Sequence, residues 1–282
     1  MAENKLIFNN NFEYVILETI YKSNINKTAF YKALEKYTGR IVGIKYIETN
    51  PNLINEYLNG VRVLINLENK VKNIPTIYQY YTNKTSLFVI MQYIEGNTLS
   101  KLMESEKESV LSKETTYLNL KRLKKICEVL SSVHKNGNTS SYTQHKDLKP
   151  QNIIVKGKFP NEDVYLIDFD LSSATIAKGT IGYQSPEQSD MFSKMTNSTR
   201  IDVFSFGLIM YEILCGKKLN FGEHLVLDIE CLKWKKIPKI SNINKNVDKQ
   251  IDLIFEKCIA FNPNERFNNG GEILCQIRKI VR

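Results

Sequence analysis

The sequence predicts an α+β chain whose strands gather toward the N-terminus and whose helices follow. Up to residue 91, short runs rich in β-branched and aromatic residues alternate with turn residues, which is typical of antiparallel strands. From residue 98 onward, apolar residues recur mainly at helical spacing. A polar loop at 145–152 lies between an amphipathic helical stretch and a short apolar run, and it holds most of the candidate catalytic residues.

The elements of the first part can be assigned in order. Five runs have strand composition, at 14–17, 30–34, 41–45, 74–78 and 87–91. Residues 37–40 form a predicted hairpin turn into the third run. A helix is predicted over 53–67, because its apolar residues repeat at intervals of three and four.

Helices dominate the second part. One begins at 98–103, and the charged stretch 104–113 after it predicts a solvated loop. A long helix follows at 117–134, with its apolar residues on one face. Two short strands, at 153–155 and 164–167, are predicted after the polar loop.

The loop His-Lys-Asp-Leu-Lys-Pro-Gln-Asn at 145–152 has a composition that suits phosphoryl transfer. In that reaction a protein mainly positions the acceptor hydroxyl and neutralises phosphate charge. Asp147 can accept a hydroxyl proton, and Lys149 can neutralise the moving phosphoryl group. Asn152 and Asp168 offer hard oxygen ligands of the kind that Mg²⁺ prefers.

The spacing Asp-x-Lys-x-x-Asn, followed by Asp-Phe at 168–169, closely resembles the catalytic loop and metal-binding motif of protein kinases. Residues 179–188, Gly-Thr-Ile-Gly-Tyr-Gln-Ser-Pro-Glu-Gln, are similar to a segment common in bacterial Ser/Thr kinases. From these motifs the chain is identified as a member of the eukaryotic-type Ser/Thr protein kinases, and the resemblance covers residues 12 to 280.

The resemblance implies a bilobal protein-kinase-like fold of the α+β class. A small antiparallel β-sheet lobe with one helix is expected to precede a larger, mainly helical lobe. We expect a single kinase domain over 1–282, with the N-terminal lobe at 12–91, a hinge at 92–96 and the C-terminal lobe at 97–282.

The resemblance also implies where ATP binds. Lys45 in Val-Gly-Ile-Lys matches the lysine of Val-Ala-Ile-Lys, which contacts the α and β phosphates. Residues 91–96 resemble the hinge whose backbone groups bind adenine, so Met91, Gln92 and Ile94 are candidate ATP-binding residues. Met91 would guard the rear of that pocket.

In the second part, the resemblance makes Asp147 and Lys149 catalytic residues, and it makes Asn152 and Asp168 ligands of Mg²⁺, with Mn²⁺ as another metal that would fit. Thr180 would bond Asp147 and Lys149 and favour Ser/Thr acceptors over Tyr.

Further residues have implied structural or regulatory roles. Asp202 would cap the backbone of the catalytic loop, and Arg266 would pair with Glu187. Possible phosphorylation sites between the metal-binding motif and residue 179 are Ser172, Ser173 and Thr175.

The chain departs from the family pattern at three places. Residues 21–28, where the family carries its glycine-rich phosphate loop, contain no glycine, although Lys22 or Lys27 could supply charge there. Gly60 stands where a helix glutamate should pair with the strand lysine, so either Glu56 takes that role or the ion pair is missing. Asp170 replaces the glycine that normally follows Asp-Phe.

Three functions are compatible with these residues. The first is transfer of the ATP γ-phosphate to Ser/Thr hydroxyls of protein substrates, including the chain itself. The second is a pseudokinase that acts as a binding or scaffold module, which the departures would explain. The third is a small-molecule kinase, since related folds phosphorylate aminoglycosides and choline.

Composition limits the kinds of partner, the location and the cysteine chemistry that are expected. The formal net charge is +9, but lysines are spread along the chain without a recognised nucleic-acid motif, so no nucleic-acid partner is expected. Neither a membrane-spanning apolar run nor a signal-peptide pattern is present, which favours a cytoplasmic location. The five scattered cysteines are expected to be buried free thiols.

Overall fold

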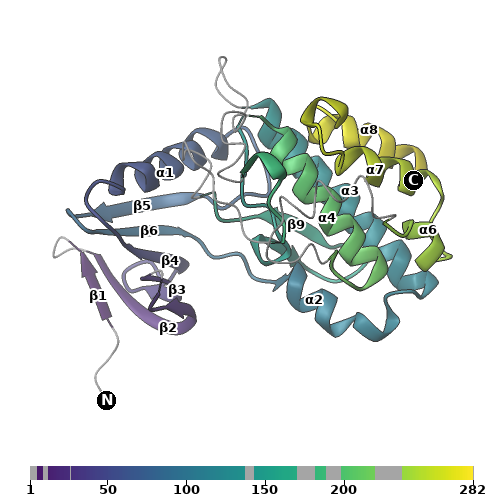
Figure 1. Cartoon of the computed structure of the whole chain (residues 1–282). Helices are drawn as coiled ribbons and strands as arrows, with labels where there is room; N and C mark the ends of the chain where they lie inside the picture. The colour runs from purple at the N-terminus through teal and green to yellow at the C-terminus, as the bar shows by residue number, and fades with distance from the viewer. Residues whose placement is uncertain are drawn as a thin grey trace. The chain divides into compact units, whose positions relative to one another are not determined.

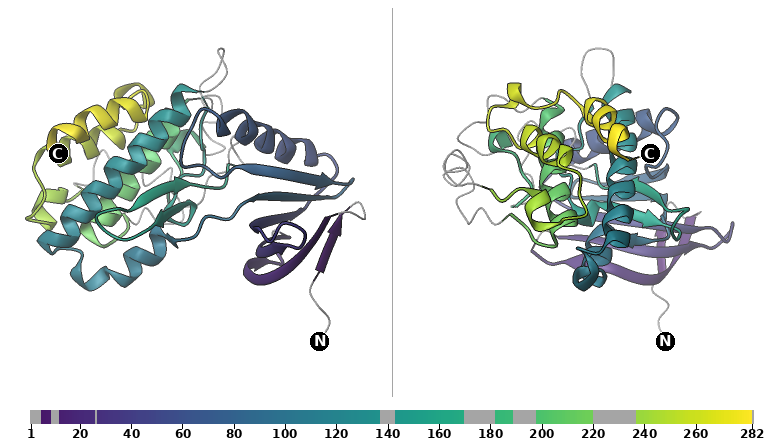
Figure 2. Two further views of the ribbon diagram at one scale, coloured as in Figure 1. Left: turned by 180° about the vertical axis from the view of Figure 1, so that it is seen from behind. Right: turned by 90° about the vertical axis from the view of Figure 1, so that its right-hand side faces the viewer.

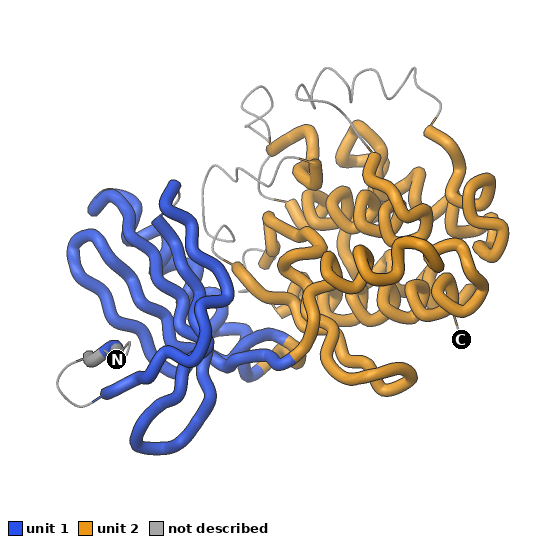
Figure 3. Tube along the Cα trace, turned by 90° about the horizontal axis from the view of Figure 1, so that it is seen from below, with its two compact units in different colours: residues 1–69, 74–95 blue, residues 70–73, 96–282 orange. Residues whose placement is uncertain are grey.

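The computed structural model of the chain describes residues 5–8, 12–25, 27–136, 143–169, 182–188, 198–219 and 237–281. The chain divides into two compact units (Figure 3). The first unit contains residues 1–69 and 74–95, and the second contains 70–73 and 96–282. Residues 70–73 group with the second unit, where the Leu166 amide donates a hydrogen bond to the Asn73 carbonyl, 3.0 Å away.

The first unit is an antiparallel sheet with one helix (Figure 1). Its strands are β1 (Lys5–Phe8), β2 (Phe12–Ser23), β3 (Thr28–Glu35), β4 (Ile41–Glu48), β5 (Ile77–Thr82) and β6 (Ser86–Gln92). They lie in the order β1-β2-β3-β4-β6-β5. Helix α1 (Ile54–Glu68) buries the apolar stripe Val61, Leu64 and Leu67, whose spacing of three residues places them on one face.

Two strand predictions in this unit need correction. The strand expected at 74–78 begins at Ile77 and runs on to Thr82. Pro75 lacks an amide to donate to a neighbouring strand, so the paired strand begins after it. Residues 21–23 and 28, expected in the phosphate loop, belong to β2 and β3, because Ser23 pairs with Thr28 and extends the hairpin to its tip.

The second unit is mainly helical, with a small sheet of three strands. Its helices are α2 (Leu99–Ser105), α3 (Lys113–Lys135), α4 (Arg200–Cys215), α6 (Ile240–Ile243), α7 (Gln250–Cys258) and α8 (Gly270–Ile280). Its strands are β7 (Asn97–Thr98), β8 (Ile153–Lys156) and β9 (Asp163–Leu166). Figure 2 shows α3 and α8 side by side. Together, the two units confirm the predicted bilobal α+β fold.

Capping explains where two helices of this unit begin. Helix α3 starts four residues before the predicted 117, because the Ser112 hydroxyl accepts a hydrogen bond from the Thr115 amide. The charged stretch before it is partly ordered, with a 3₁₀ turn at Lys107–Ser109. Thr98 caps α2 in the same way, by accepting from the Lys101 amide.

Helix α4 differs from its neighbours because it is buried on almost every face. Its residues therefore offer fixed anchor points inside the second unit.

The thiols in the part of the chain that the structure describes are free, and Cys127, Cys215 and Cys258 are buried as predicted. Cys275 is exposed, which corrects that prediction, and Cys231 lies outside the described residues. Within the described residues, no helix combines the length and apolar character needed to cross a bilayer.

Candidate active site

The polar loop that follows α3 is anchored to the buried helix α4 through one carboxylate. The backbone amides of His145 and Lys146 donate to the two oxygens of Asp202, at 2.7 Å to Oδ2 and 2.8 Å to Oδ1. Asp202 is fully buried in the first turn of α4. The structure thus confirms the capping role predicted for Asp202, and it fixes the start of the loop on a rigid element.

His134, at the end of α3, completes this anchor. Its Nε2 lies 2.9 Å from Asp202 Oδ2, and its Nδ1 accepts a hydrogen bond from the Gly270 amide at 3.0 Å. Because Nδ1 is an acceptor, the ring proton sits on Nε2 and points at the carboxylate. Burial by itself would raise the pKa of Asp202, but the contacts with His134 and then His145 outweigh burial and hold that pKa below its usual value.

The predicted catalytic residues converge on one carboxylate oxygen. Lys149 Nζ lies 2.6 Å from Asp147 Oδ2, and Asn152 Nδ2 lies 3.2 Å from the same atom. Asn152 Nδ2 also donates to the Asp147 carbonyl, at 2.9 Å. Both side chains of the pair Asp147 and Lys149 are largely buried, which strengthens their electrostatic interaction relative to an exposed pair.

The second predicted carboxylate, Asp168, lies just beyond β9. The Ile167 amide donates to the Asn152 carbonyl at 3.0 Å, so the end of β9 is tied to the end of the loop. Asp168 has a left-handed backbone, with φ of 69°, and Phe169 after it is fully buried. The ring of Phe169 packs on His145, with 4.5 Å between ring centroids, and this contact fixes the segment against the catalytic loop.

The donor set of this region fits a divalent cation such as Mg²⁺. Both side-chain hydrogen bonds of Asn152 use its Nδ2, which leaves Oδ1 as the atom suited to face a cation. Asp168 adds a partly exposed carboxylate. Within the described ranges, this region included, no three carboxylate, thiol or imidazole groups gather into a metal cluster. Mg²⁺ needs no such cluster, because it commonly takes one or two protein oxygens together with phosphates and water.

Gln188 is a positioning residue that sequence reasoning did not single out. Its Nε2 donates to the Lys146 carbonyl at 2.7 Å, and its Oε1 accepts from the Ser185 amide at 2.9 Å. It therefore joins the segment 182–188 to the catalytic loop. Lys146 has a left-handed backbone, with φ of 65°, and burial lowers its pKa, although Asp202 partly opposes that shift.

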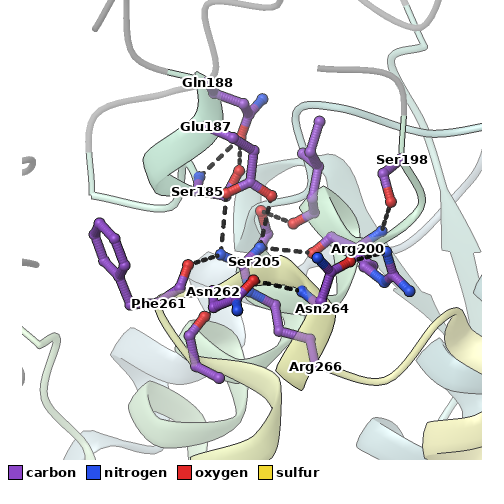
Figure 4. A network of polar contacts seen from close by, with 12 residues as sticks. Ser185, Glu187, Gln188, Ser198, Arg200, Ser205, Phe261, Asn262, Asn264 and Arg266 are labelled. Carbon is purple, nitrogen blue, oxygen red and sulfur yellow. Dashed lines mark hydrogen bonds and ion pairs between the residues drawn. The ribbon is translucent and has the colours of Figure 1, made fainter. Parts of the chain in front are cut away.

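The predicted pair of Glu187 and Arg266 is also present (Figure 4). Arg266 Nη1 and Nη2 reach the two carboxylate oxygens of Glu187 at 2.7 and 3.0 Å. Its remaining N–H groups donate to three backbone carbonyls, those of Ala260, Phe261 and Arg200. All five donors of the guanidinium are thus used, which suits a charge with no solvent exposure.

The predicted ATP-binding residues lie in the first unit. Lys45 is on β4 and is only 7% exposed. On β6, Met91 pairs with Gly43, and Gln92, the first residue of the predicted hinge, pairs with Val42 at the end of the strand. Ile94, two residues beyond β6, is buried.

The two departures in this unit have different surroundings. Glu56 is exposed in the first turn of α1, whereas Gly60 is buried on the same helix. At the hairpin tip, Lys27 Nζ lies 2.6 Å from Glu48 Oε1, and the Glu48 amide donates to the Lys27 carbonyl at 2.9 Å. Lys27 is therefore already engaged by a carboxylate of its own unit.

Some predicted residues fall outside the described part of the chain. These are the third carboxylate Asp170, the acceptor-selecting Thr180, and the possible phosphorylation sites Ser172, Ser173 and Thr175.

Comparison with known proteins supports the resemblance to protein kinases. The model of the protein kinase domain matches residues 26–277. A probable serine/threonine-protein kinase of Clostridium perfringens is 26% identical over 267 residues, which cover 89% of this chain and 36% of the relative. A probable serine/threonine-protein kinase of Clostridium acetobutylicum is 24% identical over 262 residues, which cover 89% of this chain and 37% of the relative.

A third relative, serine/threonine-protein kinase PknD of Chlamydia trachomatis, is 25% identical over 307 aligned residues. The alignment covers 92% of this chain and 30% of PknD, so the chain spans about a third of the length of these relatives. The match confirms the resemblance predicted from the motifs and does not favour the pseudokinase alternative. The chain therefore belongs to the protein kinase domain family.

Proposed function

We propose that the chain transfers the γ-phosphate of ATP to Ser/Thr hydroxyls of protein substrates, itself included. The arrangement around Asp147 supports this function best. A base that accepts a hydroxyl proton needs a fixed position, and Asp147 Oδ2 has Lys149 Nζ at 2.6 Å and Asn152 Nδ2 at 3.2 Å. The carboxylate is thus held in place by Lys149 and Asn152, and both of these residues also have roles in the proposed reaction.

In the proposed mechanism, Asp147 orients the acceptor hydroxyl and takes its proton as the phosphoryl group transfers. Lys149 neutralises charge on the moving phosphoryl group. Asn152 and Asp168 hold Mg²⁺, or Mn²⁺, which supplies positive charge to the phosphates when it is bound. Lys45 contacts the α and β phosphates.

The adenine is proposed to bind at the hinge, through backbone groups of Gln92 and Ile94, with Met91 at the rear of its pocket. Glu56 is the candidate partner of Lys45. Replacing Lys45 by Met should weaken ATP binding, because a charge that contacts the phosphates is lost.

The decisive experiment is a comparison of the wild-type protein with Asp147→Asn. Both are incubated with γ-labelled ATP and Mg²⁺ or Mn²⁺, and phosphate is measured on the chain and on a generic basic protein. We expect Asp147→Asn to lose about a hundredfold or more of the activity, because the amide cannot accept the proton. Asp163→Asn is the matched control, since Asp163 is an exposed carboxylate of the same unit.

Activity of Asp147→Asn close to that of the wild type would contradict the assignment of the base. If neither protein transfers label, and ATP does not raise the melting temperature, the chain is better explained as a binding module. Parallel tests with small hydroxylated acceptors would identify a small-molecule kinase.

A further inference from the structure

Lys45 shares one face of the first unit's sheet with residues of the two neighbouring strands, β3 and β6. Side chains directly opposite each other in paired strands point to the same face. Phe30 on β3 and Val89 on β6 lie directly opposite Lys45. Gly43 lies two residues before Lys45, so it is on this face as well, and Met91 is its partner on β6.

The ring of Phe30 covers the backbone of Gly43. A β-carbon built on Gly43 would lie 2.6 Å from Cζ and 3.2 Å from Cε2 of Phe30, and 3.5 Å from Cγ of Met91. Ordinary contact begins at 3.4 Å, so an alanine would push the ring outward by about 0.8 Å. The glycine thus lets the ring lie close against the sheet, in a motif whose usual residue at this position is alanine.

A second ring extends this aromatic surface. Tyr21 on β2 pairs with Phe30, and the two rings are nearly parallel, at 12°, with 6.4 Å between their centroids. Phe30 is partly exposed, and 43% of Tyr21 is exposed. The face around Gly43 therefore presents aromatic rings beside the aliphatic part of Met91.

We propose that the base of the bound nucleotide stacks on the ring of Phe30, and that Gly43 is the residue that makes room for this ring. The inference rests on the proposed function, in which the hinge holds the base and Lys45 holds the phosphates. The hinge starts at Gln92, opposite Val42, and Lys45 is three residues further along β4, or about 10 Å. A nucleotide that spans these points crosses the face at Gly43.

The position of the ring favours a stacking surface over a plug. A ring that blocked the site would do so most effectively if it stood out from the sheet, and an alanine at 43 would hold it out. The glycine has the opposite effect, because it draws the ring back by the width that a methyl group would need. Bases of any kind stack well on aromatic side chains, since each base has a π-face.

Four proteins test this inference: the wild type, Gly43→Ala, Phe30→Val and the double variant. The dissociation constant of Mg·ATP is measured by calorimetry, beside that of Mg·tripolyphosphate, which has phosphates but no base. We expect Gly43→Ala to weaken ATP binding about tenfold, because the ring is pushed toward the base. Phe30→Val should weaken it about fivefold through lost stacking.

The double variant gives the sharpest outcome. Valine leaves space for the methyl group, so the double variant should bind ATP within about twofold of Phe30→Val alone, whereas independent effects would multiply. Tripolyphosphate should bind all four proteins equally. Phe88→Val is the matched control, because Phe88 lies opposite Tyr46, on the other face of the same sheet, and should leave ATP affinity unchanged.

Several results would overturn the inference. Tighter ATP binding by Phe30→Val would show that the ring is a plug, and a parallel loss of tripolyphosphate binding would show that Phe30 acts only through the fold of the sheet. ATP binding by the wild type without any phosphate transfer would contradict the proposed function, but it would not contradict the stacking of the base on Phe30. Absence of ATP binding by all four proteins would overturn both.

Discussion

The Glu187→Gln substitution should destabilise the second unit strongly, because it leaves the charge of Arg266 buried without its counter-ion. The two side chains are 3% and 0% exposed, and both hydrogen bonds between them are charge-assisted. Breaking one partner of such a buried pair typically costs about 3–5 kcal/mol. For a unit of about 190 residues, each kcal/mol lowers the melting temperature by about 2–4 °C. The expected fall is therefore about 6–20 °C.

The assay is thermal unfolding followed by circular dichroism, with Glu48→Gln as the matched control. Glu48 has the same chemistry and a similar distance to its partner, 2.6 Å from Lys27 Nζ, but that pair is exposed. Exposed ion pairs are screened by water, so Glu48→Gln should leave the melting temperature unchanged within error. If the two variants behaved alike, burial would not be what gives the Glu187 pair its strength, and the reasoning would fail.

Two further predictions concern the anchored loop, and one concerns the partly buried carboxyl of Glu212 on α4. The pKa of Asp202 is lowered on folding, so its stabilisation is complete above its unfolded value of about 3.9 and is lost as the pH falls through the lower folded value. Urea unfolding from pH 6 to pH 3 should therefore show the gap between wild type and Asp202→Asn shrinking; a constant gap would argue against this. Burial raises the pKa of Glu212, against the opposing hydrogen bond from Tyr183, so Glu212→Gln should gain stability relative to wild type as the pH rises from 4 to 7. Gln188→Ala should lower kcat more than it raises KM for ATP, because Gln188 supports the catalytic loop; steady-state kinetics would reveal the opposite pattern if it contacted nucleotide instead.

Local pattern was enough to predict most elements of the fold. Runs of β-type residues located five of the six strands of the first unit, but not β1 (Lys5–Phe8), and helical spacing located α1 and α3. The errors arose where a single side chain or proline sets a boundary. The Ser112 cap extended α3 by four residues, and the strand expected at 74–78 began only beyond Pro75. Periodicity does not carry such information, because it reports which face is apolar and not where hydrogen bonding begins.

The candidate site was predictable only where its residues stand close together in the sequence. Asp147, Lys149 and Asn152 fall within six residues, and their spacing alone is enough to identify the motif. The contact of His134 with Asp202 spans 68 residues, and that of Gln188 with Lys146 spans 42. No local signal marks either contact, since each depends on how distant elements pack.

The packing of Phe30 over Gly43 was hidden for a different reason. Both residues are visible in the sequence, and the glycine was evident as a change in the Val-Ala-Ile-Lys motif. However, strand periodicity states only that a side chain lies on a face, and not that it leans diagonally over the neighbouring strand. The pair becomes meaningful once the register of β3 and β4 is known.

The hydrogen bond from the Gly270 amide to His134 links the catalytic loop to a residue about 120 positions further along the chain. The loop is anchored by Asp202, Asp202 by His134, and His134 by the first residue of α8. A ribosome adds residue 270 about 120 residues after the loop, which takes roughly 6–24 s at 5–20 residues per second. During that interval the nascent loop lacks this support, so phosphotransfer competence should be acquired only once residue 270 has been added.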